Sequence, residues 1–228
     1  VQHHGYTPGD FLDPEVIIFL GGSGGHFSKD PRLRRCGWGW AQVSFDLLFL
    51  HGQSGGLQAI THTVPRAETM ALEYAIKAIL ASTISGASFS LRSDNQGVVI
   101  GWAKGARWCR RTDQASAWSR VWTLHPELVA RSITVDVIKV KGHITQEDIE
   151  LGHWTAHDKC GNDHADRLAG LGAASMFVRA SPVGGLNASQ WESHVDATDA
   201  RCYLTVHRLL AIARHKLATS AKSNPLHL

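Results

Sequence analysis

The hydrophobic pattern of this chain changes period at Pro65, and that change constrains the fold more than any other feature of the sequence. The apolar run at 16–20 is typical of a strand covered on both faces, and 37–45 alternates as a half-buried strand does, a pattern that 46–53 continues. A third strand is expected at 57–64, after a turn at 54–56. The first part of the chain therefore predicts an antiparallel meander.

Helices and strands alternate in the remainder of the chain. One helix face is indicated by four residues at the spacing i, i+4, i+7 and i+11. These residues are Glu68, Leu72, Ala75 and Ile79. Strands are expected at 87–94 and 133–143, with helical segments at 95–105 and 114–132, and a last helix that Asn162 caps. The pattern predicts an α/β fold: a five-stranded mixed sheet flanked by helices, with a C-terminal helical extension.

Composition divides the chain into three parts. Residues 1–15 are rich in glycine and proline and are expected to form a loose leader. The predicted domain covers 16–178, and 179–228 is expected to be a linker followed by an amphipathic helical tail. Two roles remain open for that tail: a helix docked on the domain with a solvated basic face, or a helix that binds a partner or nucleic acid.

Composition also narrows the possible environments. The chain has 228 residues, and none of its apolar runs approaches the roughly 18 residues of a membrane span, so no membrane partner is expected. Its four cysteines form no CxxC pair, which favours a reducing, intracellular location, nuclear or cytoplasmic. A net charge of +3 supports nucleic-acid binding only weakly. Because the chain opens with Val1, we interpret it as a fragment or as a region of a longer polyprotein.

Three carboxylates stand at positions that invite a functional interpretation. Glu68 shares a helix face with core residues, where a carboxylate without a partner is unfavourable. Asp94 ends a predicted strand, and Asp166 lies on the last helix. Each also has an ordinary explanation. Glu68 suits the start of a helix, Asp94 can cap the next one, and Asp166 can be a surface charge beside the Asp163–Arg167 pair.

Taken in order, five motifs resemble those of the type 1 ribonuclease H domain. They are "GGSGG…CGWGWA", "RAETMALEYAI", "LRSDNQGVV", "VKGH" and "GNDHADRLAG", and the last is similar to the domains attached to retrotransposon reverse transcriptases. The resemblance covers about 16–178 and implies endonucleolytic hydrolysis of the RNA strand in RNA–DNA hybrids. It implies two Mg²⁺ or Mn²⁺ ions held by Glu68, Asp94 and Asp166, with His143 assisting proton transfer or product release.

One position departs from the family pattern. The first strand of the family ends "TDGS", whereas this sequence has Gly21 where the aspartate belongs. The missing carboxylate is the one expected to bridge both ions, and the nearest substitutes, Asp13 and Asp30, lie before the strand and beyond its turn. Two hypotheses therefore stay open: an active endonuclease, or a pseudoenzyme that binds hybrids as part of a decayed retroelement. Another nuclease or an integrase of the same fold is a remote third.

The segment 102–111 interleaves tryptophans with basic residues, at the place where the family often carries a protrusion that grips the hybrid. The predicted nucleic-acid contacts are Asn95, Gln96, Trp102, Lys104, Arg107, Trp108, Arg110 and Arg111. The alternative is a solvated loop whose tryptophans pack into the core. The expected partners are an RNA–DNA hybrid or other nucleic acid and a reverse transcriptase domain in the same polyprotein.

A second cluster offers ligands of the kinds that zinc binds. It comprises His153, His157, Cys160 and His164. Their spacing matches none of the common zinc patterns. We therefore interpret the cluster as polar residues beside a helix start.

Overall fold

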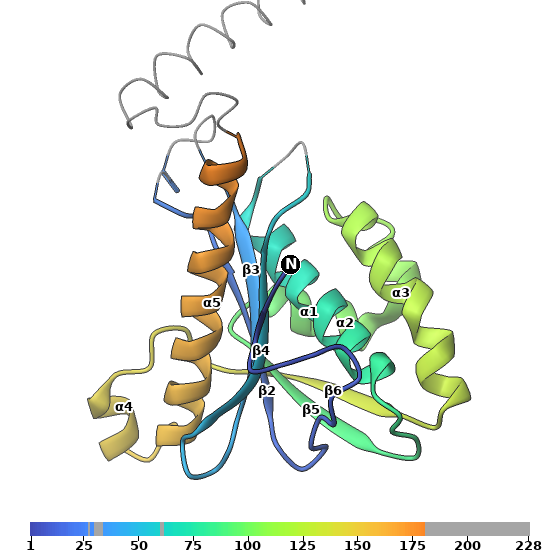
Figure 1. Cartoon of the computed structure of the whole chain (residues 1–228), viewed down its shortest axis with the longest axis horizontal. Helices are drawn as coiled ribbons and strands as arrows, with labels where there is room; N and C mark the ends of the chain where they lie inside the picture. Colours follow the sequence, from blue (N-terminus) through green and yellow to red (C-terminus); the bar gives the residue numbers. More distant parts are fainter. Residues whose placement is uncertain (27, 30–33, 60–61, 181–228) are drawn as a thin grey trace, which may run out of the picture. The chain divides into compact units, whose positions relative to one another are not determined.

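Six strands form one mixed sheet in the computed structural model, which describes residues 1–26, 28–29, 34–59 and 62–180 (Figure 1). The strands are β1 (Gln2–His4), β2 (Ile18–Ser23), β3 (Gly37–Val43), β4 (Phe49–Gly56), β5 (Ser88–Ser93) and β6 (Thr134–Lys139). Their order across the sheet is β1-β4-β3-β2-β5-β6. The first four are antiparallel neighbours, whereas β2, β5 and β6 run parallel.

Helices cover both faces of this sheet, with α5 on one face and α1, α2 and α3 on the other (Figure 1). The helices are α1 (Val64–Ala81), α2 (Gln96–Cys109), α3 (Ala115–Ala130), α4 (Gln146–Glu150) and α5 (Ala156–Ala180). The larger core lies on the α1 side, and a smaller one, which includes Phe19 and Leu168, lies under α5. The mixed sheet and the flanking helices confirm the predicted α/β class. Within the described residues, no helix is both long and apolar enough to cross a membrane.

Local chemistry explains where α1 begins and what fixes it. The Thr63 side chain accepts a hydrogen bond from the Arg66 N–H, and Pro65 stands in the first turn, where its missing N–H leaves no bond unmade. Glu73 on α1 is buried and forms ion pairs of 2.6 Å with Lys77 and 2.8 Å with Arg120 on α3. The helix predicted from the residue spacing is thereby confirmed.

The first fifteen residues belong to the folded domain, which corrects the predicted loose leader. β1 pairs antiparallel with β4 and adds a sixth strand to the five expected. Tyr6 and Leu12 are 4% and 0% exposed, so the segment after β1 contributes to the core. The prediction failed because glycine and proline content indicates the local conformation of the backbone and does not indicate whether the neighbouring side chains are buried. The compact unit is Val1–Ala180, and the predicted linker and tail lie outside the described residues.

Two further boundaries differ from prediction. The third strand of the meander is β4 at Phe49–Gly56 and not 57–64, because the chain turns back at 44–48, where Phe45 and Leu48 are exposed in spite of their apolar character. The last helix begins at Ala156 and not at Asn162, because Thr155 accepts a hydrogen bond of 3.0 Å from the Asp158 N–H.

One loop histidine supports the start of β3. His62 Nδ1 accepts a hydrogen bond of 3.0 Å from the Cys36 backbone N–H. Burial is the main cause that lowers the pKa of His62, and the nearby Arg35 guanidinium lowers it further. The ring must be neutral to accept this bond, so geometry and pKa agree.

Candidate active site

The ends of β2 and β5 meet α1 and α5 at one edge of the sheet, and Glu68 lies at the centre of this meeting. Its side chain, in the second turn of α1, is 3% exposed. It faces the end of β2 so closely that a Cβ on Gly22 would lie 2.9 Å from the Glu68 Oε1 atom. The helix register that aligns Glu68 with the core residues of α1 thus directs a carboxylate into the interior.

The surroundings of Glu68 disfavour its charge. Burial raises the pKa of Glu68 well above its ordinary value, and the nearby Asp94 and Asp166 carboxylates raise it further. A hydrogen bond from the Gly22 backbone and the Lys139 ammonium act in the opposite direction. Among the described residues, no group donates to the buried Glu68 Oε2 atom. A buried oxygen without a partner is unfavourable unless something absent from the protein alone completes it.

Asp94 directly follows β5 and lies against the loop after β6. A Cβ on Gly142 would stand 2.8 Å from the Asp94 Oδ2 atom, so the glycine permits this close approach. The Lys139 ammonium donates to the backbone oxygens of Asp94 and Val140, each at 2.6 Å. These bonds hold the ends of the two parallel strands together and fix the position of the Asp94 backbone.

Asp166 brings α5 into the same group. Burial raises the pKa of Asp166 to about 6, and Asp94 raises it too, while the nearby His143 lowers it. The Asn162 side chain, one turn earlier, donates to Asp166 Oδ2 at 3.3 Å. Three carboxylates from three elements therefore lie near one another, and the Asp94 carboxylate raises the pKa of both Glu68 and Asp166.

His143 lies at the rim of this group, where its side chain is exposed. Its backbone φ of 54° falls in the left-handed region, which residues other than glycine adopt infrequently. The conformation is set by the short turn that joins β6 to α4. Its charge interaction with Asp166 shows that the turn brings the imidazole near the carboxylates.

The donors fit a hard divalent cation in their chemistry. Carboxylate oxygens are the ligands that Mg²⁺ and Mn²⁺ prefer, and the Glu68 Oε2 atom, which has no hydrogen-bond partner in the described part of the chain, is available as a ligand. Within the part of the chain that the structure describes, however, no three His, Cys, Asp or Glu side chains already stand close enough to hold one ion. The carboxylate side chains are thus chemically suited to such an ion, but in the described residues they are not close enough together to coordinate one.

Gly21 lies within β2, opposite Gly39 of β3. A Cβ at this position would stand 2.8 Å from the Ala165 carbonyl carbon of α5, so helix backbone occupies the direction in which a side chain would start. The two carboxylates nearest to Gly21 in sequence, Asp13 and Asp30, were not expected to point into the site. The Asp13 carboxylate accepts from the Glu15 N–H, away from the site, and Asp30 lies outside the described residues.

The predicted nucleic-acid residues occupy two kinds of position. Asn95 caps α2 by accepting from the Gly97 N–H at 2.8 Å, and Gln96 beside it is exposed. Trp102 is held by the protein itself: its indole N–H donates to the Val135 oxygen of β6 at 2.9 Å, and its ring stacks on Trp122. The alternative of a packed tryptophan therefore describes the Trp102 position.

The remaining members of that set lie on either side of a kink in α2, where Gly105 has φ 79°. Lys104 stands 5.8 Å from the centre of the Trp108 ring. Arg107, Arg110 and Arg111 are exposed. The kink thus places a short run of basic side chains on the surface between α2 and α3.

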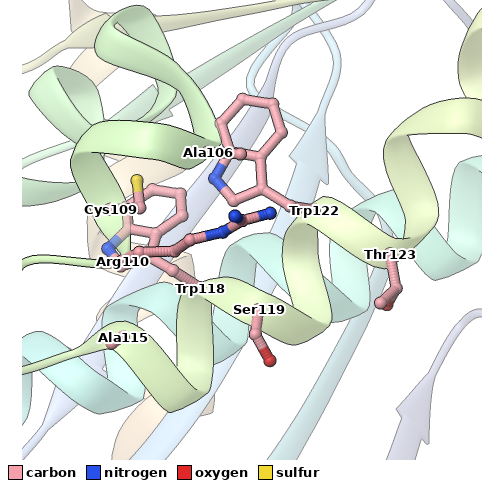
Figure 2. Close-up of a pocket in the computed structure, with 8 residues that line it drawn as sticks. All are labelled: Ala106, Cys109, Arg110, Ala115, Trp118, Ser119, Trp122 and Thr123. Carbon is pink, nitrogen blue, oxygen red and sulfur yellow. The ribbon is translucent and has the colours of Figure 1, made fainter.

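A pocket of about 210 Å³ lies under this run. Figure 2 shows the Arg110 side chain extending between the rings of Trp118 and Trp122, which line the pocket together with Cys109. The role of Trp118 and Trp122 here was missed from the sequence, although their i, i+4 spacing on α3 places both on one helix face. Asn162 was predicted only as a helix cap. Its i, i+4 spacing from Asp166 is the sequence feature that indicates the side-chain hydrogen bond between the two residues.

The histidines and the cysteine considered for zinc are spread along α5 and the turn before it. His157 Nε2 is hydrogen bonded to the Val43 oxygen at 2.8 Å, and its ring packs between Phe19 and Phe45. His164 packs against Phe49. Both side chains have structural neighbours, in keeping with the interpretation as a polar helix start.

Comparison with known proteins identifies the fold. No protein-family model and no curated protein matches the sequence. The solution structure of the PFV ribonuclease H domain matches with a TM-score of 0.51 at 18% identity, covering 71% of this chain and 95% of that one. The foamy viral protease–reverse transcriptase in complex with RNA/DNA hybrid matches with a TM-score of 0.50 at 20% identity, covering 73% of this chain.

The match spans only 21% of the foamy viral chain, which is much longer than the domain. A native structure of the prototype foamy virus protease–reverse transcriptase gives the same picture, with a TM-score of 0.50 at 22% identity over 74% of this chain and 22% of that one. These neighbours agree with the resemblance found in the motifs. The described chain has the fold of ribonuclease H domains.

Proposed function

We propose that this domain is a ribonuclease H-type endonuclease that hydrolyses the RNA strand of RNA–DNA hybrids with divalent metal ions. One observation carries the proposal: the buried Glu68 carboxylate has an oxygen with no hydrogen-bond partner among the described residues, and it lies close enough to Asp94 and Asp166 for their charges to raise its pKa. Three neighbouring carboxylates destabilise a protein that only has to fold. They suit one whose site is completed by cations.

Each residue of the proposed site has its own role. Glu68, Asp94 and Asp166 would hold Mg²⁺ or Mn²⁺, which when bound activates water and neutralises a leaving oxygen. Asn162 orients Asp166 through its bond to Oδ2. His143, exposed at the rim, is placed to carry a proton between the site and solvent.

The surface beside the site suits the backbone of a hybrid. Lys104, Arg107, Arg110 and Arg111 offer charges that neutralise phosphates, and Gln96 at the start of α2 is free to contact a base or a sugar. Trp108 and Asn95 complete the proposed contact surface, with Trp102 supporting it from beneath. A reverse transcriptase domain in the same polyprotein is the proposed partner.

A second function is favoured by one specific observation. Gly21 stands where the motif pattern places a bridging carboxylate, so the centre has three acidic ligands where the family has four. A domain that binds hybrids without cutting them would keep the basic surface and tolerate this loss. This second candidate predicts hybrid binding that does not depend on Mg²⁺.

Cleavage of an end-labelled RNA–DNA hybrid in Mg²⁺ and in Mn²⁺ tests the proposal, with Glu68→Gln as the inactive control. Hybrid binding is measured in parallel in EDTA. Cutting by the natural chain that Glu68→Gln abolishes supports the nuclease. Binding in EDTA together with no cutting in either metal would replace it with the second candidate.

A further inference from the structure

The position of Gly21 is filled by helix backbone. A Cβ there would lie 2.8 Å from the Ala165 carbonyl carbon, 2.9 Å from its oxygen and 3.0 Å from the Asp166 nitrogen. Real Cβ atoms essentially never approach closer than 3.0 Å. No flexible side chain can move aside, because all three atoms belong to the main chain of α5.

The same helix is pressed against the sheet at several other points. A Cβ on Gly39 would stand 2.6 Å from the Ala169 nitrogen, and one on Gly37 would stand 2.0 Å from the Ala173 nitrogen. From the helix side, a Cβ on Gly172 would stand 2.4 Å from the Gly55 oxygen. α5 therefore lies directly on strand backbone over several turns.

We propose that Gly21 is a positioning residue: by lacking a side chain it lets α5 approach β2 and so sets where Asp166 stands relative to Glu68 and Asp94. The inference rests on the proposed function in treating these carboxylates as metal ligands. On this view the site is built for three carboxylates, and position 21 is not a vacant fourth ligand position.

Restoring the family aspartate at position 21 would be expected to restore metal binding, and the proposal predicts the opposite. Gly21→Asp restores the family motif in sequence, yet the new Cβ must displace the Ala165–Asp166 peptide before its carboxylate can reach an ion. Moving that peptide moves Asp166. The substitution therefore exchanges one ligand for another, and we expect it to weaken metal binding.

Three variants test this against a matched control. Gly21→Ala introduces only the Cβ, Gly21→Asp adds the carboxylate, and the double variant Gly21→Ala/Ala165→Gly also removes the methyl group of Ala165. The control, Gly172→Ala, also places a Cβ against strand backbone, but at six residues from Asp166 along α5. For each protein, Mn²⁺ affinity is measured by titration calorimetry and stability by the urea midpoint.

We expect both Gly21 variants to lower the urea midpoint and to weaken Mn²⁺ binding about tenfold, the usual loss when a group that orients a ligand is disturbed. Ala165→Gly should not rescue Gly21→Ala, because the crowded atoms are main chain. Gly172→Ala should lower the midpoint and leave Mn²⁺ affinity unchanged. Loss of stability alone cannot produce this split between the two measurements.

Tighter Mn²⁺ binding by Gly21→Asp, with an unchanged urea midpoint, would overturn the proposal and make position 21 a vacant ligand position. So would Mn²⁺ affinity in Gly21→Ala equal to that of the natural chain. If the natural chain binds no Mn²⁺, the proposed function fails separately. The positioning role is then judged by the amide NMR signals of Ala165 and Asp166, which should shift in Gly21→Ala, and unchanged signals would refute it.

Discussion

Replacing Glu68 with glutamine should abolish metal-dependent activity and yet stabilise the metal-free domain. Glu68 is 3% exposed, its Oε2 atom has no partner among the described residues, and two further carboxylates lie nearby. Glu68→Gln removes the charge and keeps an oxygen for the Gly22 N–H. A buried polar group without a partner costs about 1–3 kcal/mol, and we expect a gain of that order in the free energy of unfolding at neutral pH.

The pH dependence of this gain follows from the direction of the pKa shift. The pKa of Glu68 is raised in the folded state, so the folded state binds the proton more tightly than the unfolded state does. Its contribution to stability is present below the ordinary glutamate pKa and is lost as pH rises through the folded value. Glu68→Gln should therefore melt like the natural chain at about pH 4 and exceed it increasingly at higher pH.

Urea denaturation with EDTA, at several pH values between about 4 and 8, measures this difference. Added Mn²⁺ supplies the second arm: it should stabilise the natural chain by about 2.7 kcal/mol at a hundred times its dissociation constant and leave Glu68→Gln unaffected. A variant that is less stable than the natural chain at pH 7 in EDTA would refute the reasoning. The carboxylate would then be satisfied within the protein.

Three further predictions concern the fold and its surface. Glu73→Ala removes both ion pairs that a buried carboxylate makes on α1 and with α3, and should lower the free energy of unfolding by about 1–3 kcal/mol; an unchanged urea midpoint would contradict it. Because the pKa of His62 is lowered, the unfolded chain binds its proton more readily, so stability should fall as pH drops below about 6.5, and His62→Gln should reduce that dependence in urea midpoints at pH 5 and 8. Arg110→Ala should weaken hybrid binding and reduce the salt slope of the affinity by about one, as seen in a fluorescence-anisotropy titration at several salt concentrations; an unchanged slope would remove Arg110 from the proposed contact surface.

Much of the fold could be predicted because its elements are encoded locally. The spacing of Glu68 and its neighbours specifies one helix face, and the alternation at 133–143 specifies a strand. Errors arose where a local signal had two meanings. The apolar Phe45 and Leu48 extended a strand pattern into an exposed turn, and Asn162, a good cap by type, lies inside a helix that Thr155 begins.

The sequence could place the three carboxylates of the candidate site near one another, but it could not predict how the helix packs beside them. The motifs identify Glu68, Asp94 and Asp166 residue by residue, and the charge interactions show that the fold brings them near one another. The close approach of α5 to Gly21 could not be predicted from the sequence, because the atoms that fill the side-chain position of Gly21 belong to Ala165, 144 residues away in the chain. The sequence alone does not distinguish a glycine that has replaced a metal ligand from a glycine that allows a helix to pack closely against a strand.

The hydrogen bond from Trp102 to the Val135 oxygen has a consequence for how this domain behaves among copies of itself. β6 ends the sheet, and the outer row of an end strand is a template on which a strand from another chain can pair. Here an indole already occupies one of its acceptors and a stacked pair of rings, Trp102 on Trp122, stands beside it. An incoming strand would have to displace that aromatic cover first, so α2 protects the β6 border of the sheet against edge-to-edge aggregation.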